Sequence, residues 1–177
     1  MNINQMTTKL QEAIVLAKSL AEKMNHQQIE QEHLFLALLQ QYEGLTERVL
    51  QKLKVDTQAL QLDLNGLLKS KPEVSGASSD AYISNQLNQT FKKADEWKNE
   101  WEDDFLSVEH ILLALFHQNS MSHPLKKLSN TYNLHEAYLQ QAIQEIRGNQ
   151  KVTSKEPEST YEALKKYGRD LIEEVKS

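Results

Sequence analysis

The stretch Glu32-His33-Leu34-Phe35-Leu36-Ala37-Leu38-Leu39 is repeated later in the chain as Glu109-His110-Ile111-Leu112-Leu113-Ala114-Leu115-Phe116, so one pattern occurs twice. Both copies read Glu-His, three apolar residues, Ala and two apolar residues. A helix that is apolar on nearly every side is buried all round. The sequence therefore predicts two equivalent central helices.

The register that aligns Glu32 with Glu109 also aligns the segments that precede these helices, placing Leu10 on Leu87 and Ala17 on Ala94. With small length changes, the pairing continues after them as Leu50–Leu125, Leu53–Leu128, Val55–Leu134, Leu60–Leu139, Leu64–Ile143 and Leu67–Ile146. Apolar residues recur at three- and four-residue spacing, whereas strand signals are poor. The chain is therefore expected to be all-α, with four helices in each of two repeats, about 6–70 and 83–147.

Each repeat is short for an independent core, which favours one compact domain in which both repeats pack by a pseudo-twofold over residues 1–148. Thr7 or Thr8 is expected to cap the first helix, and Ser122-His123-Pro124 marks another helix start. Residues 149–158 contain one apolar residue and are expected to form a flexible linker. A last helix is expected over 159–177, without an obvious partner in the chain.

Composition excludes several classes of protein. The 20 basic residues against 25 acidic ones give a net charge of −5, which disfavours nucleic-acid binding. The chain has no Cys, which excludes disulfide scaffolds, thiol nucleophiles and cysteine-ligated zinc. No apolar run approaches the roughly 20 residues that span a bilayer, and the start lacks a signal peptide. We expect no membrane association and a cytoplasmic protein.

Catalytic and metal motifs are weak. Glu30-Gln31-Glu32-His33 has the Glu-x-x-His spacing of di-iron helical bundles, but the second repeat has Ser107 where the ligand should be. The alternative is that His33 and His110 are structural groups that form hydrogen bonds near a helix start. No nucleophile elbow, phosphate loop or dinucleotide-binding turn is present. We therefore expect no metal, no cofactor and no enzyme activity in this chain.

Two apolar residues distinguish the first repeat from the second. Val15 and Leu16 lie outside the buried stripe of the first helix, and their counterparts are Lys92 and Lys93. They either fill the seam between the repeats or form an exposed apolar patch that binds another polypeptide.

Trp97 and Trp101 occupy positions equivalent to Leu20 and Met24. This equivalence favours core packing for both tryptophans. Trp97 lies nearer the edge of the apolar stripe, so a contribution to a binding surface stays open for it.

Several segments resemble the N-terminal Clp repeat domain of the Clp/Hsp100 family of AAA+ unfoldases, and in particular its ClpB disaggregase branch. They are Met6-Thr7-Thr8-Lys9-Leu10-Gln11-Glu12-Ala13, Ile29-Glu30-Gln31-Glu32-His33-Leu34-Phe35-Leu36-Ala37-Leu38-Leu39 and Val108-Glu109-His110-Ile111-Leu112-Leu113-Ala114-Leu115. The stretch Ala163-Leu164-Lys165-Lys166-Tyr167-Gly168-Arg169-Asp170-Leu171 is similar to the segment that leads into the first ATPase module of that branch.

The resemblance implies a chaperone domain that binds exposed hydrophobic segments of unfolded or aggregated polypeptides and passes them to a hexameric threading pore. It implies roles in substrate binding for Thr7, Asp103 and Glu109, in a groove near the first helix and the 100–110 loop. It also implies that the longer protein contains ATPase modules that use ATP and Mg, works with the DnaK chaperone system in protein refolding, and forms its hexamer outside this domain, which is then a monomer by itself.

Two alternatives differ from this expectation. The first is an adaptor-docking domain like those of protease-coupled Clp proteins, which would bind one partner tightly and selectively. The second is a metal-dependent helical-bundle enzyme, which would contain stoichiometric iron or zinc.

Overall fold

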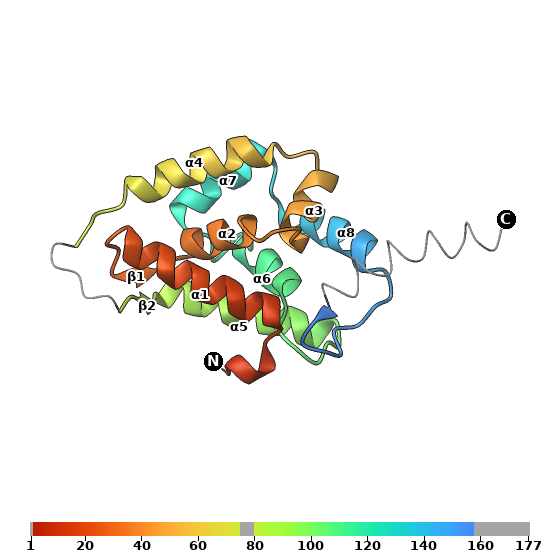
Figure 1. Ribbon diagram of the computed structural model, residues 1–177. Coiled ribbons are helices and arrows are strands. Elements are labelled where there is room, and N and C mark those ends of the chain that lie inside the picture. Colours follow the sequence, from red (N-terminus) through yellow and green to blue (C-terminus); the bar gives the residue numbers. More distant parts are fainter. Residues whose placement is uncertain (1, 75–79, 158–177) are drawn as a thin grey trace.

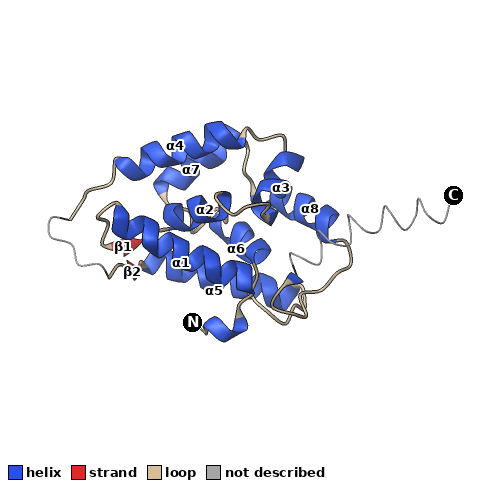
Figure 2. Ribbon diagram, viewed as in Figure 1, coloured by secondary structure: helices blue, strands red, loops and turns tan. Residues whose placement is uncertain are grey.

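The computed structural model describes residues 2–74 and 80–157 (Figure 1). The helix expected over 159–177 lies outside these residues. Helices dominate the described part, and its two strands have two residues each (Figure 2). The all-α prediction is confirmed.

Each repeat contributes four α-helices in the same order, as the paired apolar residues predicted. Those of the first repeat are α1 (Thr8–Lys23), α2 (Gln31–Leu39), α3 (Leu45–Lys52) and α4 (Thr57–Lys69). Those of the second are α5 (Asn85–Glu100), α6 (Val108–Leu115), α7 (His123–Tyr132) and α8 (Glu136–Arg147). Helices α1 and α5 both have 16 residues and begin at equivalent positions of the two repeats, Thr8 and Asn85.

The two central helices are α2 and α6, and every residue in both is buried. They contact each other, and the rings of Phe35 and Phe116 meet edge to face with centroids 5.1 Å apart. The outer helices also pair across the repeats, because α3 packs on α8 and α4 packs on α7 (Figure 1). The two repeats therefore share one core.

Short backbone pairings relate the repeats by a pseudo-twofold. Strand β1 (Gln28–Ile29) pairs in parallel with β2 (Tyr82–Ile83), so that Ile29 is opposite Ile83. A parallel bridge joins Met6 to Leu106. Met6 and Ile83 occupy equivalent positions in the repeats, and so do Ile29 and Leu106, so the two pairings are one arrangement used twice. In each, the segment before one repeat's first helix pairs with the segment before the other repeat's central helix.

Hydroxyl groups cap the helices where the sequence predicts them to begin. The Thr7 hydroxyl accepts a hydrogen bond from the Leu10 N–H (3.3 Å), and the Ser122 hydroxyl accepts one from the Leu125 N–H (3.2 Å). Such caps satisfy N–H groups that have no partner within the first helical turn. Thr7, rather than Thr8, is the cap of α1.

The two pattern histidines cap the central helices. Nδ1 of His33 accepts the Glu30 N–H, and Nδ1 of His110 accepts the Ser107 N–H, both at 2.9 Å. A neutral imidazole that accepts at Nδ1 carries its hydrogen on Nε2. The Nε2 of His33 lies 2.8 Å from Nδ1 of His26, and that of His110 lies 2.7 Å from Oδ2 of Asp103. The structural interpretation of both histidines is therefore correct.

The burial of Val15, Leu16 and Trp97 bears on the interpretations that the sequence left open for them. Val15 is 67% exposed, so it does not fill the seam between the repeats. Leu16 is partly buried and packs against the core. Trp97 is 7% exposed and contacts Trp101, with ring centroids 5.5 Å apart, which is the core packing that its position in the repeat favours.

The expectation of a flexible linker over 149–158 needs correction for its described part. Val152, its one apolar residue, is fully buried, and its N–H donates to Oδ1 of Asp103 (2.9 Å). The Asp104 N–H donates to the Val152 carbonyl, and the Thr8 N–H donates to the Lys155 carbonyl, both at 2.8 Å. Composition could not reveal these contacts because their partners are far away in the sequence.

We predict that Leu16→Asp and Val15→Asp have different effects on stability. Leu16→Asp places a carboxylate against the core and should lower the free energy of unfolding by about 1–3 kcal/mol. Val15→Asp changes an exposed position and should stay within about 0.5 kcal/mol of the wild type. Urea denaturation followed by circular dichroism measures both. Equal losses in the two variants would contradict these placements.

We predict that acid destabilises the domain through the His26–His33 pair. Burial, the His26 ring and the Lys71 ammonium lower the pKa of His33 to about 3, and burial with Lys71 also lowers the pKa of His26. In the unfolded chain, histidine binds a proton below about pH 6.5. The free energy of unfolding should therefore be highest above about pH 6.5 and should fall toward pH 3. His33 should account for a loss of about 2 kcal/mol between pH 7 and pH 5.

Urea denaturation at pH 7 and pH 5 measures this loss. His33→Gln keeps a hydrogen-bond acceptor for the Glu30 N–H and should reduce the loss, whereas His123→Gln, at an exposed histidine, serves as the control. A stability that is constant or rises on acidification would contradict the prediction.

Candidate functional site

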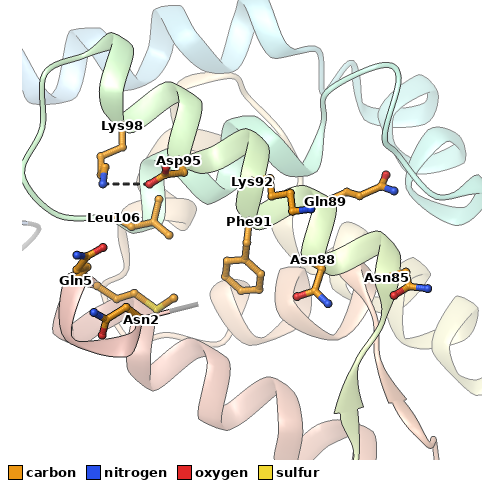
Figure 3. A pocket seen from close by; sticks show the side chains of 11 residues that line it. Asn2, Gln5, Asn85, Asn88, Gln89, Phe91, Lys92, Asp95, Lys98 and Leu106 are labelled. Atoms are coloured by element: carbon orange, nitrogen blue, oxygen red, sulfur yellow. Dashed lines mark ion pairs between the residues drawn. The ribbon is translucent and has the colours of Figure 1, made fainter.

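A groove of about 670 Å³ lies between the N-terminal segment and α5 (Figure 3). Its apolar floor is formed by Met6, Phe91 and Leu106, and Phe91 projects from α5 into the space (Figure 3). These side chains are at most 6% exposed, so the rim covers most of the floor. The rim consists of amide and charged side chains, namely Asn2, Gln5, Asn85, Asn88, Gln89, Lys92, Asp95 and Lys98.

One wall of the groove is a polar face of α5. Asn85, Asn88, Gln89, Lys92 and Asp95 follow one another at intervals of three or four residues or are adjacent, which places them on one face of α5. Ser84 begins this helix by accepting the Leu87 N–H at 3.1 Å. The face is polar because the opposite side of α5 packs on the core.

The opposite wall depends on the pairing of the repeats. The Leu106 N–H donates to the Gln5 carbonyl (2.8 Å), and the Thr7 N–H donates to the Leu106 carbonyl (2.9 Å). These bonds hold η1 (Ile3–Gln5) beside the loop that precedes α6. The groove is therefore formed by both repeats together.

The charges on the rim are of both signs. Lys98 and Asp95 form an ion pair with an N–O distance of 3.0 Å, and Lys92 is an exposed cation on the same face. Five carboxamide side chains accompany them, and each can both donate and accept hydrogen bonds. Such a rim suits the main chain of an extended polypeptide, while the floor suits an apolar side chain.

The three polar residues implied by the resemblance lie outside this groove lining and are buried. Thr7 is fully buried and caps α1, as described above. Asp103 is 6% exposed, and Glu109 is fully buried. Thr7 follows Met6 in the chain, and Asp103 lies shortly before Leu106, so both are close in sequence to residues of the groove floor.

Asp103 is the centre of a buried cluster. Arg147 donates two hydrogen bonds to its carboxylate, at 2.6 and 3.0 Å, and the Nε2 of His110 donates a third. The Val152 N–H donates a fourth. Burial alone would raise the pKa of the Asp103 carboxyl, but these bonds from His110, Arg147 and Val152 hold that pKa well below its usual range. Asp103 is thus an ionised structural group.

Glu109 belongs to the same cluster. The Ser107 hydroxyl donates to its Oε1 (2.5 Å), and Nη1 of Arg147 lies 3.5 Å from its Oε2. Its counterpart Glu32 has the same type of environment, because the Ser122 hydroxyl donates to Oε1 (2.5 Å) and Nζ of Lys71 lies 3.6 Å from Oε2. Both buried glutamates are thus paired with a serine hydroxyl and a basic side chain next to a central helix.

The remaining candidates, Val15, Leu16 and Trp97, also lie outside the groove lining. Sequence analysis in turn missed the groove residues themselves. Their only sequence signal was the density of Asn and Gln around Asn2–Gln5 and Asn85–Gln89, two segments that the repeat alignment does not bring together.

Within residues 2–74 and 80–157, no three His, Asp or Glu side chains lie close enough together to hold a metal ion. Over the same residues, none of the helices has the length and apolar character needed to cross a bilayer.

Comparisons with known proteins agree with the architecture. Residues 5–128 match the family model of the Clp repeat (R) N-terminal domain. The chaperone protein ClpB of Bacillus cereus is 43% identical over 180 residues, which cover 100% of this chain and 20% of the relative. Chaperone protein ClpB 1 of Synechococcus elongatus is 44% identical over 97% of this chain and 19% of the relative. The chain thus spans about a fifth of the length of these relatives.

A solved structure shows the same fold. The Hsp104 N-terminal domain from Candida albicans superimposes with a TM-score of 0.76 at 20% sequence identity, over 87% of this chain and 99% of the other. The shared fold, the family model and the relatives agree. The chain belongs to the family of Clp repeat (R) N-terminal domains, and the relatives that match it over nearly its whole length are named chaperone protein ClpB.

Proposed function

We propose that this domain binds exposed hydrophobic segments of unfolded or aggregated polypeptides in the groove between η1 and α5, and delivers them to the threading pore of a hexameric disaggregase. The observation that supports this proposal is the composition of the groove. An apolar floor is surrounded by carboxamides from both repeats. The floor selects apolar side chains, and the rim can bind any main chain.

The geometry also favours weak and tolerant binding. A fully buried apolar side chain contributes about 1–3 kcal/mol, and the ordering of the client offsets much of that gain. Met6, Phe91 and Leu106 are almost completely covered by the rim. Unless the rim opens, an apolar side chain of the client therefore contributes a binding free energy in the lower part of this range. Weak binding suits a domain that must release its client to a pore.

The larger context is part of the same proposal. The longer protein would contain AAA+ modules that bind ATP and Mg and form the hexamer, while this domain remains a monomer by itself. It would act in the cytoplasm and refold clients together with the DnaK chaperone system. The ClpB names of the relatives, of which this chain spans a fifth, support this context.

We predict that Gln89→Arg weakens the binding of a labelled, reduced and alkylated apolar polypeptide about tenfold, because the long charged side chain occupies the groove. Glu12→Arg is the matched control, since Glu12 is the exposed counterpart of Gln89 on α1 and lies outside the groove lining. It should change the affinity less than twofold. Fluorescence anisotropy measures both affinities, and thermal unfolding checks that both variants are folded.

Equal affinities for Gln89→Arg and the wild type would contradict the groove as the binding site. If no unfolded polypeptide binds to the wild type, but one folded partner binds tightly and saturably, the domain is an adaptor-docking module instead.

A further inference from the structure

The segment that leaves the second repeat is tied to the body of the domain at several points. The guanidinium of Arg147 donates to the Gln150 carbonyl, from Nε at 3.0 Å and from Nη2 at 2.7 Å, while it also binds Asp103. Nζ of Lys151 donates to the Trp101 carbonyl (2.7 Å). With the bonds of Val152 and Lys155 described above, residues 150–155 follow one continuous track over the 101–104 turn to the start of α1.

The first repeat provides an internal comparison. With a small length change in the repeat register, Val74 aligns with Val152, and the Val74 N–H likewise bonds to the preceding turn, at the Asn25 carbonyl (2.9 Å). Val74, however, is 38% exposed, whereas Val152 is fully buried. A valine therefore bonds to the preceding turn after each repeat, and only the second of the two is buried.

The residues that hold the second copy are specific to it. The counterpart of Asp103 is His26, and the His26–His33 pair corresponds to the Asp103–His110 pair. In the register that pairs Leu64 with Ile143, the counterpart of Arg147 is Leu68, a fully buried core residue. An arginine and an aspartate that are both almost completely buried are costly unless they are paired and hydrogen-bonded. Asp103 and Arg147 each also bind residues 150–155, here called the exit segment. The position of the exit segment is therefore linked to the buried cluster.

The track borders the proposed groove. Asp103 and Asp104 begin the loop that continues to Leu106 on the groove floor, and Thr8 follows Met6 and Thr7. The exit segment contacts both sides of this junction, through Asp104 and through Thr8. A segment held here leaves the domain beside the groove.

We propose that Asp103, Arg147 and Val152 form a latch that holds residues 150–155 against the 101–104 turn and the start of α1, so that the chain leaves the domain in one fixed direction beside the groove. Asp103 and Arg147 are positioning residues in this account. They act on the exit segment and need not touch a client. The latch goes beyond the proposed function and can be tested without a client.

Amide hydrogen exchange in the full chain tests the latch. The reporters are the N–H groups of Thr8 and Asp104, which belong to the body of the domain but donate to the exit segment. Val152→Ser should speed their exchange at least tenfold and leave the Tyr82 and Ser84 amides, which pair β1 with β2, unchanged. Val74→Ser is the matched control in the first repeat and should leave all four amides unchanged.

Asp103→Asn gives a second, independent measurement. It removes the charge that Arg147 binds, and should speed exchange at Thr8 and Asp104 and increase tryptic cleavage after Lys151 and Lys155 severalfold. Should this variant fail to fold, Val152→Ser alone decides the result. Fast exchange at Thr8 and Asp104 in the wild type, or slow exchange that Val152→Ser does not change, would overturn the latch. Neither result depends on whether the groove binds polypeptides.

Discussion

The cross-repeat backbone pairing is the constraint on which the rest of the structure depends. The segment before α1 pairs with the segment before α6, and the segment before α5 pairs with the segment before α2. Backbone N–H and C=O groups at buried positions must find partners, and here they find them in the other repeat. Each repeat therefore needs the other to pair the backbone that precedes its first and central helices. One consequence is the shared core, and another is a groove with a wall from each repeat.

Buried polar groups reinforce the same junctions. Each central helix has a fully buried glutamate and histidine in its first turn, at Glu32-His33 and Glu109-His110. A buried carboxylate is costly unless hydrogen bonds and a cation compensate for it, and each glutamate has a serine donor and a nearby basic side chain. The same requirement explains why the buried Asp103 and Glu109 both have hydrogen-bond donors and a nearby Arg147. The histidine of each pair caps its helix by accepting the N–H of Glu30 or Ser107.

The sequence was sufficient for the features that arise from periodicity. The alignment of the two repeats predicted both central helices and the order of the helices around them, and Thr7 or Thr8 and the segment Ser122-His123-Pro124 predicted helix starts. Features that depend on contacts between distant residues were not accessible. Arg147 lies 44 residues from Asp103, and nothing local marks them as partners. For the same reason, the burial of a single valine at 152 was not predicted from a polar stretch.

The groove illustrates the same limit for the candidate site. Its lining combines residues near position 5 with residues of α5 and with Leu106, which periodicity alone does not bring together. The resemblance directed attention to a region next to the groove, because Thr7 and Asp103 lie close in sequence to Met6 and Leu106. The groove is nevertheless lined by Met6 and Leu106, and Thr7 and Asp103 are not part of its lining. Val15 is exposed, but it lies outside the groove lining.

The most direct test of the central claim is an NMR titration of this chain with a permanently unfolded, apolar polypeptide, followed amide by amide. The account predicts shifts concentrated at Gln5, at Leu106 and along the Asn85–Lys98 face of α5, with little change on α4 and α7. Shifts that are absent from this region, or that gather instead around Val15 on α1, would contradict the assignment of the groove as the polypeptide-binding site.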